Sequence, residues 1–475
     1  MTGAEDTAAS ASSDAPAGRS IGATVHRAVH CATALIDGVA VAGIRLTVTD
    51  DGRTAAVERG VAPRPGDLRL GLVLPGAGNA HSHAFHRVLR GRTHSGGGDF
   101  WRWRKQMYDA AAALDPDRYH DLALGVYGEM LAAGWTAVGE FHYVHHRPDG
   151  TPYAPLHAME RALAEAARSV GIRLTLLDTC YLTGGIGRPL APEQRRFGDG
   201  TAAGFLRRWT ALRASLPGDV VLGAALHSVR GVPPDAIAEI VRELPDDVPL
   251  HVHLSEQPQE NTDSLAAHGR TPTGVLARAG ALGPRLSVVH ATHLTDDDVR
   301  ALGDARVTAV LCPTTEADLG DGIGPARRLA DAGARIALGT DQHAVVDPFV
   351  EARSLEAEER LASGRRGRFA PTELVTAATT AGYASLGLDG GIRPGAWCDL
   401  VEVDAASVRT VGATPDQVVL AATAADVRRV VVGGAVRAHG GTLAPATDGR
   451  PRACDPALLL GQALTRFPDP AKERP

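Results

Sequence analysis

The stretch at residues 70–83 reads "LGLVLPGAGNAHSH", an apolar run that ends in His81 and His83. Seven more apolar or β-branched runs follow it, and segments of helical period separate them. A series of eight strand–helix units is typical of a (β/α)8 barrel, so we predict an α/β fold of this type. The other runs are "TAVGEFHYV" (136–144), "RLTLLDTCYL" (173–182), "VVLGAALHSV" (220–229), "PLHVHLSE" (249–256), "LSVVHATH" (286–293), "VTAVLCPTTE" (307–316) and "RIALGTDQH" (335–343).

The two ends of the chain differ from this pattern. Residues 32–57, 395–412 and 426–441 alternate apolar and polar side chains and contain turn residues, which favours short antiparallel strands. We therefore expect a small β-sandwich, built from both flanks, beside the barrel. The predicted boundaries are a disordered tail at 1–20, the sandwich at 21–69 and 389–450, the barrel at 70–388 and a C-terminal extension at 451–475.

The composition narrows the classes of function. The chain has 475 residues, a net charge of -6 and no clustered run of lysine or arginine, which argues against nucleic acid or a membrane as partner. A small-molecule substrate is therefore expected. Five scattered cysteines without a CxxC pair predict reduced thiols and a cytoplasmic location. Trp101 and Trp103 suggest the interface of a homodimer.

Histidine and acidic residues stand where several of these runs end. The carboxyl ends of barrel strands form one rim, and this rim carries the chemistry of barrel enzymes. Histidines two apart on a strand face the same side, and a metal site needs three or four such ligands from separate elements. The sequence therefore predicts a metal site at the rim. The residues at these ends are His81, His83, His253, Glu256, His290 and Asp341.

Two of the runs carry a second histidine. We interpret His251 as a core residue, because His253 lies nearer the rim, and we favour His290 over His293 as the functional member of its pair. The sequence does not decide the role of His145 and His146. Imidazole and carboxylate ligands of this kind suit a divalent metal; zinc is our first choice, and iron and manganese tolerate the same ligand types.

These residues resemble those of the amidohydrolase superfamily, whose members have an HxH on strand 1, a His on each of strands 5 and 6 and an Asp on strand 8. The resemblance covers roughly residues 25–440 and implies a metal-dependent barrel flanked by a β-sandwich. Many members bind two metals bridged by a carbamylated lysine after strand 4. That run here is "LGAALHSVRG" (222–231), and the only lysines of the chain are Lys105 and Lys472. The resemblance therefore implies one metal.

Within this superfamily the chain is similar to the formimidoylglutamate deiminase family. The similarity rests on the blocks "NAHSHAFHR" (79–87), "FWRWRKQMY" (100–108), "TAVGEFHYVHH" (136–146), "HSVRGV" (227–232), "HVHLSEQ" (251–257), "VHATH" (289–293), "CPTTEADLGDGI" (312–323) and "GTDQH" (339–343). Two of them, "EFHYVHH" and "PTTEADLGDGI", are the specific ones, because HxH and GxD recur throughout the superfamily.

The resemblance assigns roles to individual residues. It implies zinc ligation by His81, His83, His253 and Asp341, catalytic roles for Glu256, His290 and Asp341, and substrate contacts by His86, Arg104, Tyr143, His227 and Arg230. His86 stands where the family has glutamine, and "GTDQH" replaces the expected "GSDSH", although the ligand aspartate is kept.

The implied reaction is hydrolysis of N-formimidoyl-L-glutamate to N-formyl-L-glutamate and ammonia in histidine degradation, with a metal-bound hydroxide as nucleophile. Arg104 and Arg230 suit the two substrate carboxylates, because guanidinium binds carboxylate in a bidentate geometry. One alternative is a mononuclear deaminase of guanine or a related purine, which the 4% aromatic content disfavours. Another is a non-catalytic binding protein, which the complete set of ligands together with Glu256 disfavours.

Overall fold

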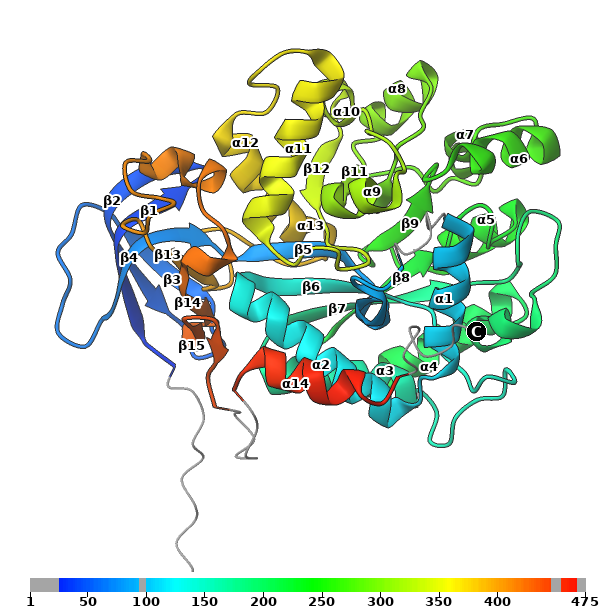
Figure 1. Cartoon of the computed structure of the whole chain (residues 1–475), viewed down its shortest axis with the longest axis horizontal. Helices are drawn as coiled ribbons and strands as arrows, with labels where there is room; N and C mark the ends of the chain where they lie inside the picture. The colour runs from blue at the N-terminus through cyan, green and yellow to red at the C-terminus, as the bar shows by residue number, and fades with distance from the viewer. Residues whose placement is uncertain (1–24, 94–99, 446–453, 468–475) are drawn as a thin grey trace, which may run out of the picture.

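The computed structural model describes residues 25–93, 100–445 and 454–467. Eight parallel strands form a barrel that runs from β5 to β12 in sequence order (Figure 1). Thr340 N and Asp341 N both donate to the His81 carbonyl at 3.0 Å, which joins the last strand to the first. The predicted α/β barrel is confirmed. Its strands are β5 (Ala77–Ser82), β6 (Trp135–His142), β7 (Arg173–Cys180), β8 (Val221–Leu226), β9 (Leu250–Leu254), β10 (Leu286–His290), β11 (Thr308–Leu311) and β12 (Arg335–Leu338).

Amphipathic helices cover the outside of the barrel (Figure 1). In α5, for example, Ile237 and Ile240 are buried while Glu239 is half-buried and Arg242 and Glu243 lie toward solvent. No described helix is both long enough and apolar enough to cross a membrane. The helices are α1 (Phe100–Ala112), α2 (Pro116–Ala133), α3 (Ala158–Val170), α4 (Ala202–Ser215), α5 (Pro234–Glu243), α6 (Pro258–His268), α7 (Pro272–Arg278), α8 (Asp296–Asp304), α9 (Pro313–Leu319), α10 (Ala326–Ala332) and α11 (Pro348–Ser363).

Strands from both ends of the chain form a second sheet beside the barrel, as expected (Figure 1). Its order is β16-β15-β14-β13-β4-β1-β2-β3, and α12 (Pro371–Thr376) and α13 (Gly382–Ser385) connect the barrel to it. The C-terminal α14 (Pro456–Leu464) packs on α2. The strands are β1 (Ala28–Ile36), β2 (Val39–Val48), β3 (Thr54–Glu58), β4 (Leu68–Pro75), β13 (Leu400–Val403), β14 (Val427–Val432), β15 (Ala435–His439) and β16 (Thr442–Leu443).

The run at residues 70–83 is two strands rather than the single strand that the sequence suggested. β4 pairs with β1 and β13 in the terminal sheet, whereas β5 pairs with β6 in the barrel. The chain changes sheets at Gly76, where a Cβ atom would lie 2.2 Å from Thr136 Oγ1. We propose to start the barrel domain at Ala77; the other domain boundaries stay predictions, and the tail at 1–20 lies outside the described residues.

Candidate active site

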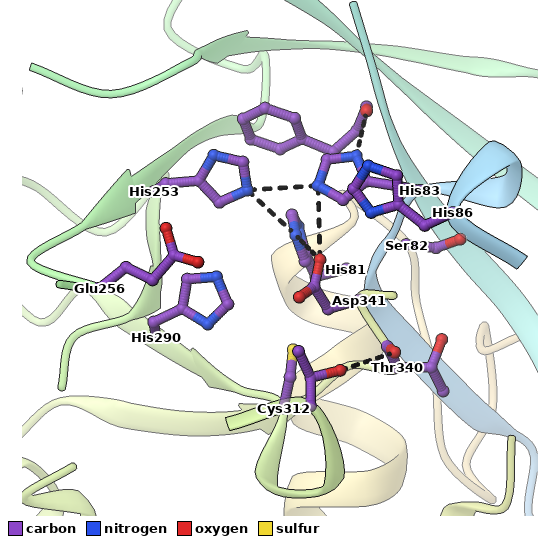
Figure 2. Close-up of polar contacts among 12 residues, drawn as sticks. His81, Ser82, His83, His86, His253, Glu256, His290, Cys312, Thr340 and Asp341 are labelled. Atoms are coloured by element: carbon purple, nitrogen blue, oxygen red, sulfur yellow. Dashed lines mark hydrogen bonds and ion pairs between the residues drawn. The ribbon is translucent and has the colours of Figure 1, made fainter. Parts of the chain in front are cut away.

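Four side chains converge at the carboxyl rim of the barrel, as Figure 2 shows. His81 lies on β5 and His83 follows it, His253 lies on β9, and Asp341 follows β12. Asp341 Oδ1 is 3.3 Å from His81 Nε2 and 3.4 Å from His83 Nε2. His253 Nε2 is 3.2 Å and 3.3 Å from the same two nitrogens. The structure thus brings together the four predicted ligands, which we call the rim cluster.

Four of the six distances between the ligand atoms of the rim cluster, 3.2–3.4 Å, suit one metal ion with tetrahedral coordination. With metal–ligand bonds of about 2.0–2.1 Å, tetrahedral ligand atoms are about 3.3 Å apart. His83 Nδ1 donates to the Phe141 carbonyl at 2.8 Å. His253 Nδ1 donates to the His227 carbonyl at 2.9 Å. Both Nε2 atoms therefore present lone pairs to the centre, and lone pairs this close repel each other unless a cation lies between them.

Burial keeps the ligand histidines neutral. Desolvation is the largest effect on His83 and lowers its pKa to about 3. It also lowers the pKa of His81 and of His253 well below the usual value. Neutral imidazole is the form that binds a metal, so these histidines are ready to act as ligands near neutral pH.

The strand ends at the rim have unusual backbone conformations. Eight non-glycine residues of the described chain have positive φ, and each such position costs about 1–3 kcal/mol. Gly339 directly follows β12. A larger residue does not fit there, because its Cβ atom would lie 2.8 Å from His81 Cβ. This strain is concentrated where it directs side chains into the barrel mouth. Five of the eight residues lie at the ends of β9, β10 and β12: Ser255, His290, Ala291, Asp341 and His343.

A buried carboxylate fixes the segment that carries the two β5 histidines. Glu140, on β6, accepts hydrogen bonds from Ser82 Oγ at 2.9 Å and from Ala84 N at 2.7 Å. Burial raises the pKa of Glu140 to about 7. The sequence analysis missed this residue. The signal that would have found it is a lone acid inside an apolar strand, because a buried carboxylate needs partners.

Glu256 and His290 border the rim cluster (Figure 2). A nitrogen of His290 lies within 4.8 Å of ligand atoms of His81 and His253, and its Nδ1 is 3.3 Å from Glu316 Oε1. Burial disfavours the charged ring, but the hydrogen bond to Glu316 and the nearby carboxylates raise the pKa of His290 to about 10. His290 thus lies beside the rim cluster and is hydrogen-bonded to a buried carboxylate.

A cavity of about 740 Å³ opens above the rim cluster, and all five predicted substrate contacts line it. His86 Nε2 lies 3.1 Å from Tyr143 Oη at the cavity wall. Arg230 Nη2 donates to Glu256 Oε2 at 3.2 Å, a contact that the sequence analysis did not predict. The five residues are His86, Arg104, Tyr143, His227 and Arg230.

Aromatic side chains are concentrated in this cavity. Five of the twenty aromatic residues of the chain line it, so the low aromatic content of the whole chain does not disfavour a purine ligand in this cavity. The Trp103 ring lines the cavity 5.2 Å from the His86 ring, and it is half-buried rather than exposed. The side chain of Trp101 lies outside the described residues. The aromatic residues are Trp103, Tyr108, Tyr143, Tyr181 and Phe197.

The family model of the amidohydrolases matches residues 72–437, which include the whole barrel, the rim cluster and part of the terminal sheet. The chain belongs to the amidohydrolase family. The formimidoylglutamate deiminase of Pseudomonas aeruginosa is 39% identical over 375 residues, covering 76% of this chain and 82% of the relative. The 8-oxoguanine deaminase of the same species is 30% identical over 414 residues, covering 83% and 89%.

Solved amidohydrolase structures share the fold. An amidohydrolase from Brucella melitensis is 34% identical with a TM-score of 0.85, covering 93% of this chain and 99% of that one. An adenosine deaminase from Xanthomonas campestris with bound zinc is 23% identical with a TM-score of 0.78, covering 92% and 97%. The second likeness concerns the fold alone.

The position after the fourth barrel strand holds no lysine in this amidohydrolase. β8 ends at Leu226, and His227, Ser228 and Arg230 follow it. Lys105 lies far from this strand end in sequence, on α1, where it is exposed and pairs with Asp109 at 2.9 Å. The rim of the described barrel thus lacks the lysine that would bridge two metals.

A second group of histidines and acids lies beside β6 and β7. Glu160 Oε1, from α3, is 2.9 Å from His145 Nδ1 and 3.4 Å from His142 Nε2. Arg208, from α4, donates to Asp178 Oδ1 at 2.7 Å. His145, whose role the sequence left open, therefore belongs to a buried network of ion pairs. We call it the inner network; its members are His142, His145, His146, Glu160, Asp178, Asp199 and Arg208.

Proposed function

We propose that this chain is a deiminase that hydrolyses N-formimidoyl-L-glutamate to N-formyl-L-glutamate and ammonia, as inferred from its sequence. The observation that carries the proposal is the position of Arg230, which lines the same cavity as the rim cluster and Glu256. The 39% identity to the Pseudomonas aeruginosa formimidoylglutamate deiminase supports this substrate.

We propose that the rim cluster holds one divalent metal, with zinc as first choice. The ligand spacing and the absence of a rim lysine in the described barrel support a single ion. Such an ion supplies the Lewis acidity that makes water a nucleophile at neutral pH.

Different side chains around the rim cluster carry out the separate proton transfers. Water adds its oxygen to the formimidoyl carbon, and the carbon–nitrogen bond breaks to release ammonia. Asp341 accepts the proton of the attacking water, and Glu256 carries protons to the departing nitrogen. His290, which borders the rim cluster, orients the reacting group by hydrogen bonding. Positioning by these residues and stabilisation of developing charge lower the barrier.

The arginines bind the remainder of the substrate. Two carboxylates need two cationic partners, and Arg104 and Arg230 both line the cavity. Arg104 Nε donates to Tyr108 Oη at 2.9 Å, which orients its guanidinium. The other polar groups of the substrate form hydrogen bonds with Tyr143, His227 and His86.

A purine deaminase is the second candidate. The aromatic side chains of the cavity favour it, because they offer faces on which a base can stack. The 30% identity to an 8-oxoguanine deaminase supports the same alternative.

An ammonia-release assay separates these candidates. Purified enzyme with measured metal content is incubated with N-formimidoyl-L-glutamate, guanine and 8-oxoguanine. Our proposal predicts turnover of the first compound and at least 100-fold lower kcat/KM for the purines, about 2.7 kcal/mol of discrimination. If the enzyme turns over only a purine, the second candidate replaces the proposal. If none of the three compounds releases ammonia, the remaining hypothesis is a non-catalytic binding protein.

The remaining expectations are also proposals. A cytoplasmic location follows from the cysteine pattern, and four of the five cysteines are buried free thiols. We keep the homodimer as a prediction, without the support of Trp103. Nucleic acid and membranes are not expected partners at a net charge of -6.

A further inference from the structure

The wall of the cavity contains a carboxylate that the proposed reaction does not use. Glu260 lies in the first turn of α6, lines the cavity and is 1% exposed. Neither of its carboxylate oxygens has a hydrogen-bond partner among the described residues. A buried carboxylate in such surroundings is stable only if it is protonated or balanced by a positive charge.

Glu260 shares one guanidinium with Glu256. Arg230 Nη2 donates to Glu256 Oε2 at 3.2 Å, and Arg230 Nε lies 3.5 Å from Glu260 Oε2. The Arg230 side chain is 23% exposed, so it also reaches the open part of the cavity. One positive charge thus faces two carboxylates before any substrate is present.

A substrate carboxylate changes this balance. Its arrival places a third negative charge on the same guanidinium, in a site where burial strengthens repulsion between like charges. We propose, on the basis of the proposed function, that Glu260 is a positioning residue that orients Arg230 in the free enzyme and takes up one proton when a substrate carboxylate binds. The proton comes from solvent and returns to it when the product leaves.

The surroundings of Glu260 make it the group that accepts this proton. Three charged or titratable side chains face it: Arg230 from the segment after β8, Glu256 from the segment after β9 and His290 from β10. Burial is the largest effect and raises the pKa of Glu260 to about 7; the charge of Arg230 opposes this rise, and repulsion by Glu256 adds to it. A further negative charge on Arg230 raises this pKa again, so a proton binds near neutral pH.

The sign of the pH dependence follows from linkage. Carboxylate binding favours protonated Glu260, so affinity is highest below pH 7 and falls by about tenfold per pH unit above it, until the raised pKa of the complex is passed. Glu260→Gln imitates the protonated form and should bind the carboxylate with the same affinity at pH 6.5 and pH 8.5. Its kcat should stay within a few-fold of wild type, because Glu260 does not touch the reacting atoms.

Calorimetric titration of the metal-loaded enzyme with N-formyl-L-glutamate, the product, measures the proton directly. Titrations at pH 8 in two buffers of different ionisation enthalpy should give about one proton taken up per product bound by wild type. Asp263→Asn is the matched control, since it removes an exposed carboxylate from the same helix and the same cavity, and it should match wild type. Glu260→Gln should take up close to none.

Two results would overturn the inference: uptake near zero in wild type, or the same uptake in Glu260→Gln as in wild type. The wild-type titration stands even if Glu260→Gln does not fold, and Glu260→Asp, which keeps a carboxyl group, should retain the uptake. Failure of the proposed function looks different. Wild type would then release no ammonia from N-formimidoyl-L-glutamate and bind no N-formyl-L-glutamate, and Glu260 would have no carboxylate to respond to.

Discussion

The rim cluster and the inner network contain the same residue types but differ in their charge balance. In the inner network, Arg208 donates to Asp199 through Nε at 2.7 Å and Nη2 at 3.0 Å, and to Asp178 at 2.7 Å. In the rim cluster, the ion pairs of Asp341 among the described residues are with histidines alone. The inner network therefore contains its own cation, whereas the rim cluster needs one from outside.

The histidine rings show the same difference. His145 uses both nitrogens within the protein, Nδ1 with Glu160 at 2.9 Å and Nε2 with the Thr179 carbonyl at 2.9 Å. Although burial opposes ionisation, hydrogen bonds from His142 and His145 hold the pKa of Glu160 well below its usual value. The guanidinium of Arg208 balances carboxylates of the inner network, so closeness of histidines and acids does not by itself identify a metal site. We expect catalysis from one group and stability from the other.

Removal of one histidine from each group gives the largest contrast. His83→Ala should lower the metal content from about one ion per chain to near zero and abolish ammonia release, because three ligands remain and the tetrahedral set is broken. His142→Ala should keep the metal. Elemental analysis of both purified variants makes the measurement, and equal metal loss in the two would contradict the distinction.

Removal of one carboxyl charge separates proton transfer from structure. Glu256→Gln should keep the metal and lose at least ~100-fold in kcat, because an amide preserves geometry but cannot carry protons. Glu160→Gln, the matched change in the inner network, should leave kcat within a few-fold. Steady-state kinetics at saturating substrate test both variants. Near-normal turnover by Glu256→Gln would assign the proton shuttle to another residue.

Removal of the inner cation should affect stability alone. Arg208→Met leaves Asp178 and Asp199 buried without their partner, which should lower the free energy of unfolding by about 3–5 kcal/mol. Arg168→Met breaks an exposed pair with Asp219 and should cost about 1 kcal/mol or less. Urea denaturation of both variants checks the values. Loss of the catalytic metal from Arg208→Met would mean that the two groups are coupled.

Removal of the cavity cation should affect substrate binding alone. Arg230→Ala should lower kcat/KM for N-formimidoyl-L-glutamate by roughly 30-fold to several thousand-fold, since loss of one partner from a desolvated charge pair typically costs about 2–5 kcal/mol. The metal content should not change, and a small formamidine without carboxylates should be affected little. If both compounds lose activity equally, Arg230 supports the fold instead of the substrate.

The smallest effect concerns the residue that fixes β5. Glu140→Gln should weaken metal binding by about 10–100-fold, because Ser82, between the two histidines, and Ala84, directly after His83, would lose one of the two carboxylate oxygens that fix this segment. Competition with a chelator of known affinity measures this change. Unaltered metal affinity would show that Glu140 serves the barrel core and not the rim cluster.

Much of the rim cluster was predictable because strand ends have one fixed destination in a barrel. An apolar run that ends in His81 and His83, or in Asp341, places these side chains at the same rim whatever the lengths of the helices between them. His251 was correctly assigned to the core, where its Nε2 lies 2.9 Å from the Ser385 carbonyl. The position of a residue along its strand therefore predicts whether its side chain lies in the core or at the rim.

The parts that the sequence did not predict depend on partners distant in the chain. Glu260 resembles an ordinary acid in the first turn of a helix, where the helix dipole alone explains it. Arg208 has no feature that distinguishes it from other arginines until α4 places it against Asp178. The break at Gly76 depends on contact with Thr136, and Trp103 resembled a surface residue because its neighbour His86 lies seventeen positions earlier. The residues adjacent in the sequence do not predict any of these contacts.

Reconstitution with metal shows whether the rim cluster binds a single catalytic ion. Metal-free protein is titrated with zinc, and ammonia release from N-formimidoyl-L-glutamate is measured after each addition. The account predicts that activity rises in proportion to added zinc and reaches its maximum at about one equivalent per chain, as one tetrahedral set of ligands requires. Activity that continues to rise to two equivalents, or no ammonia at any zinc concentration, would contradict it.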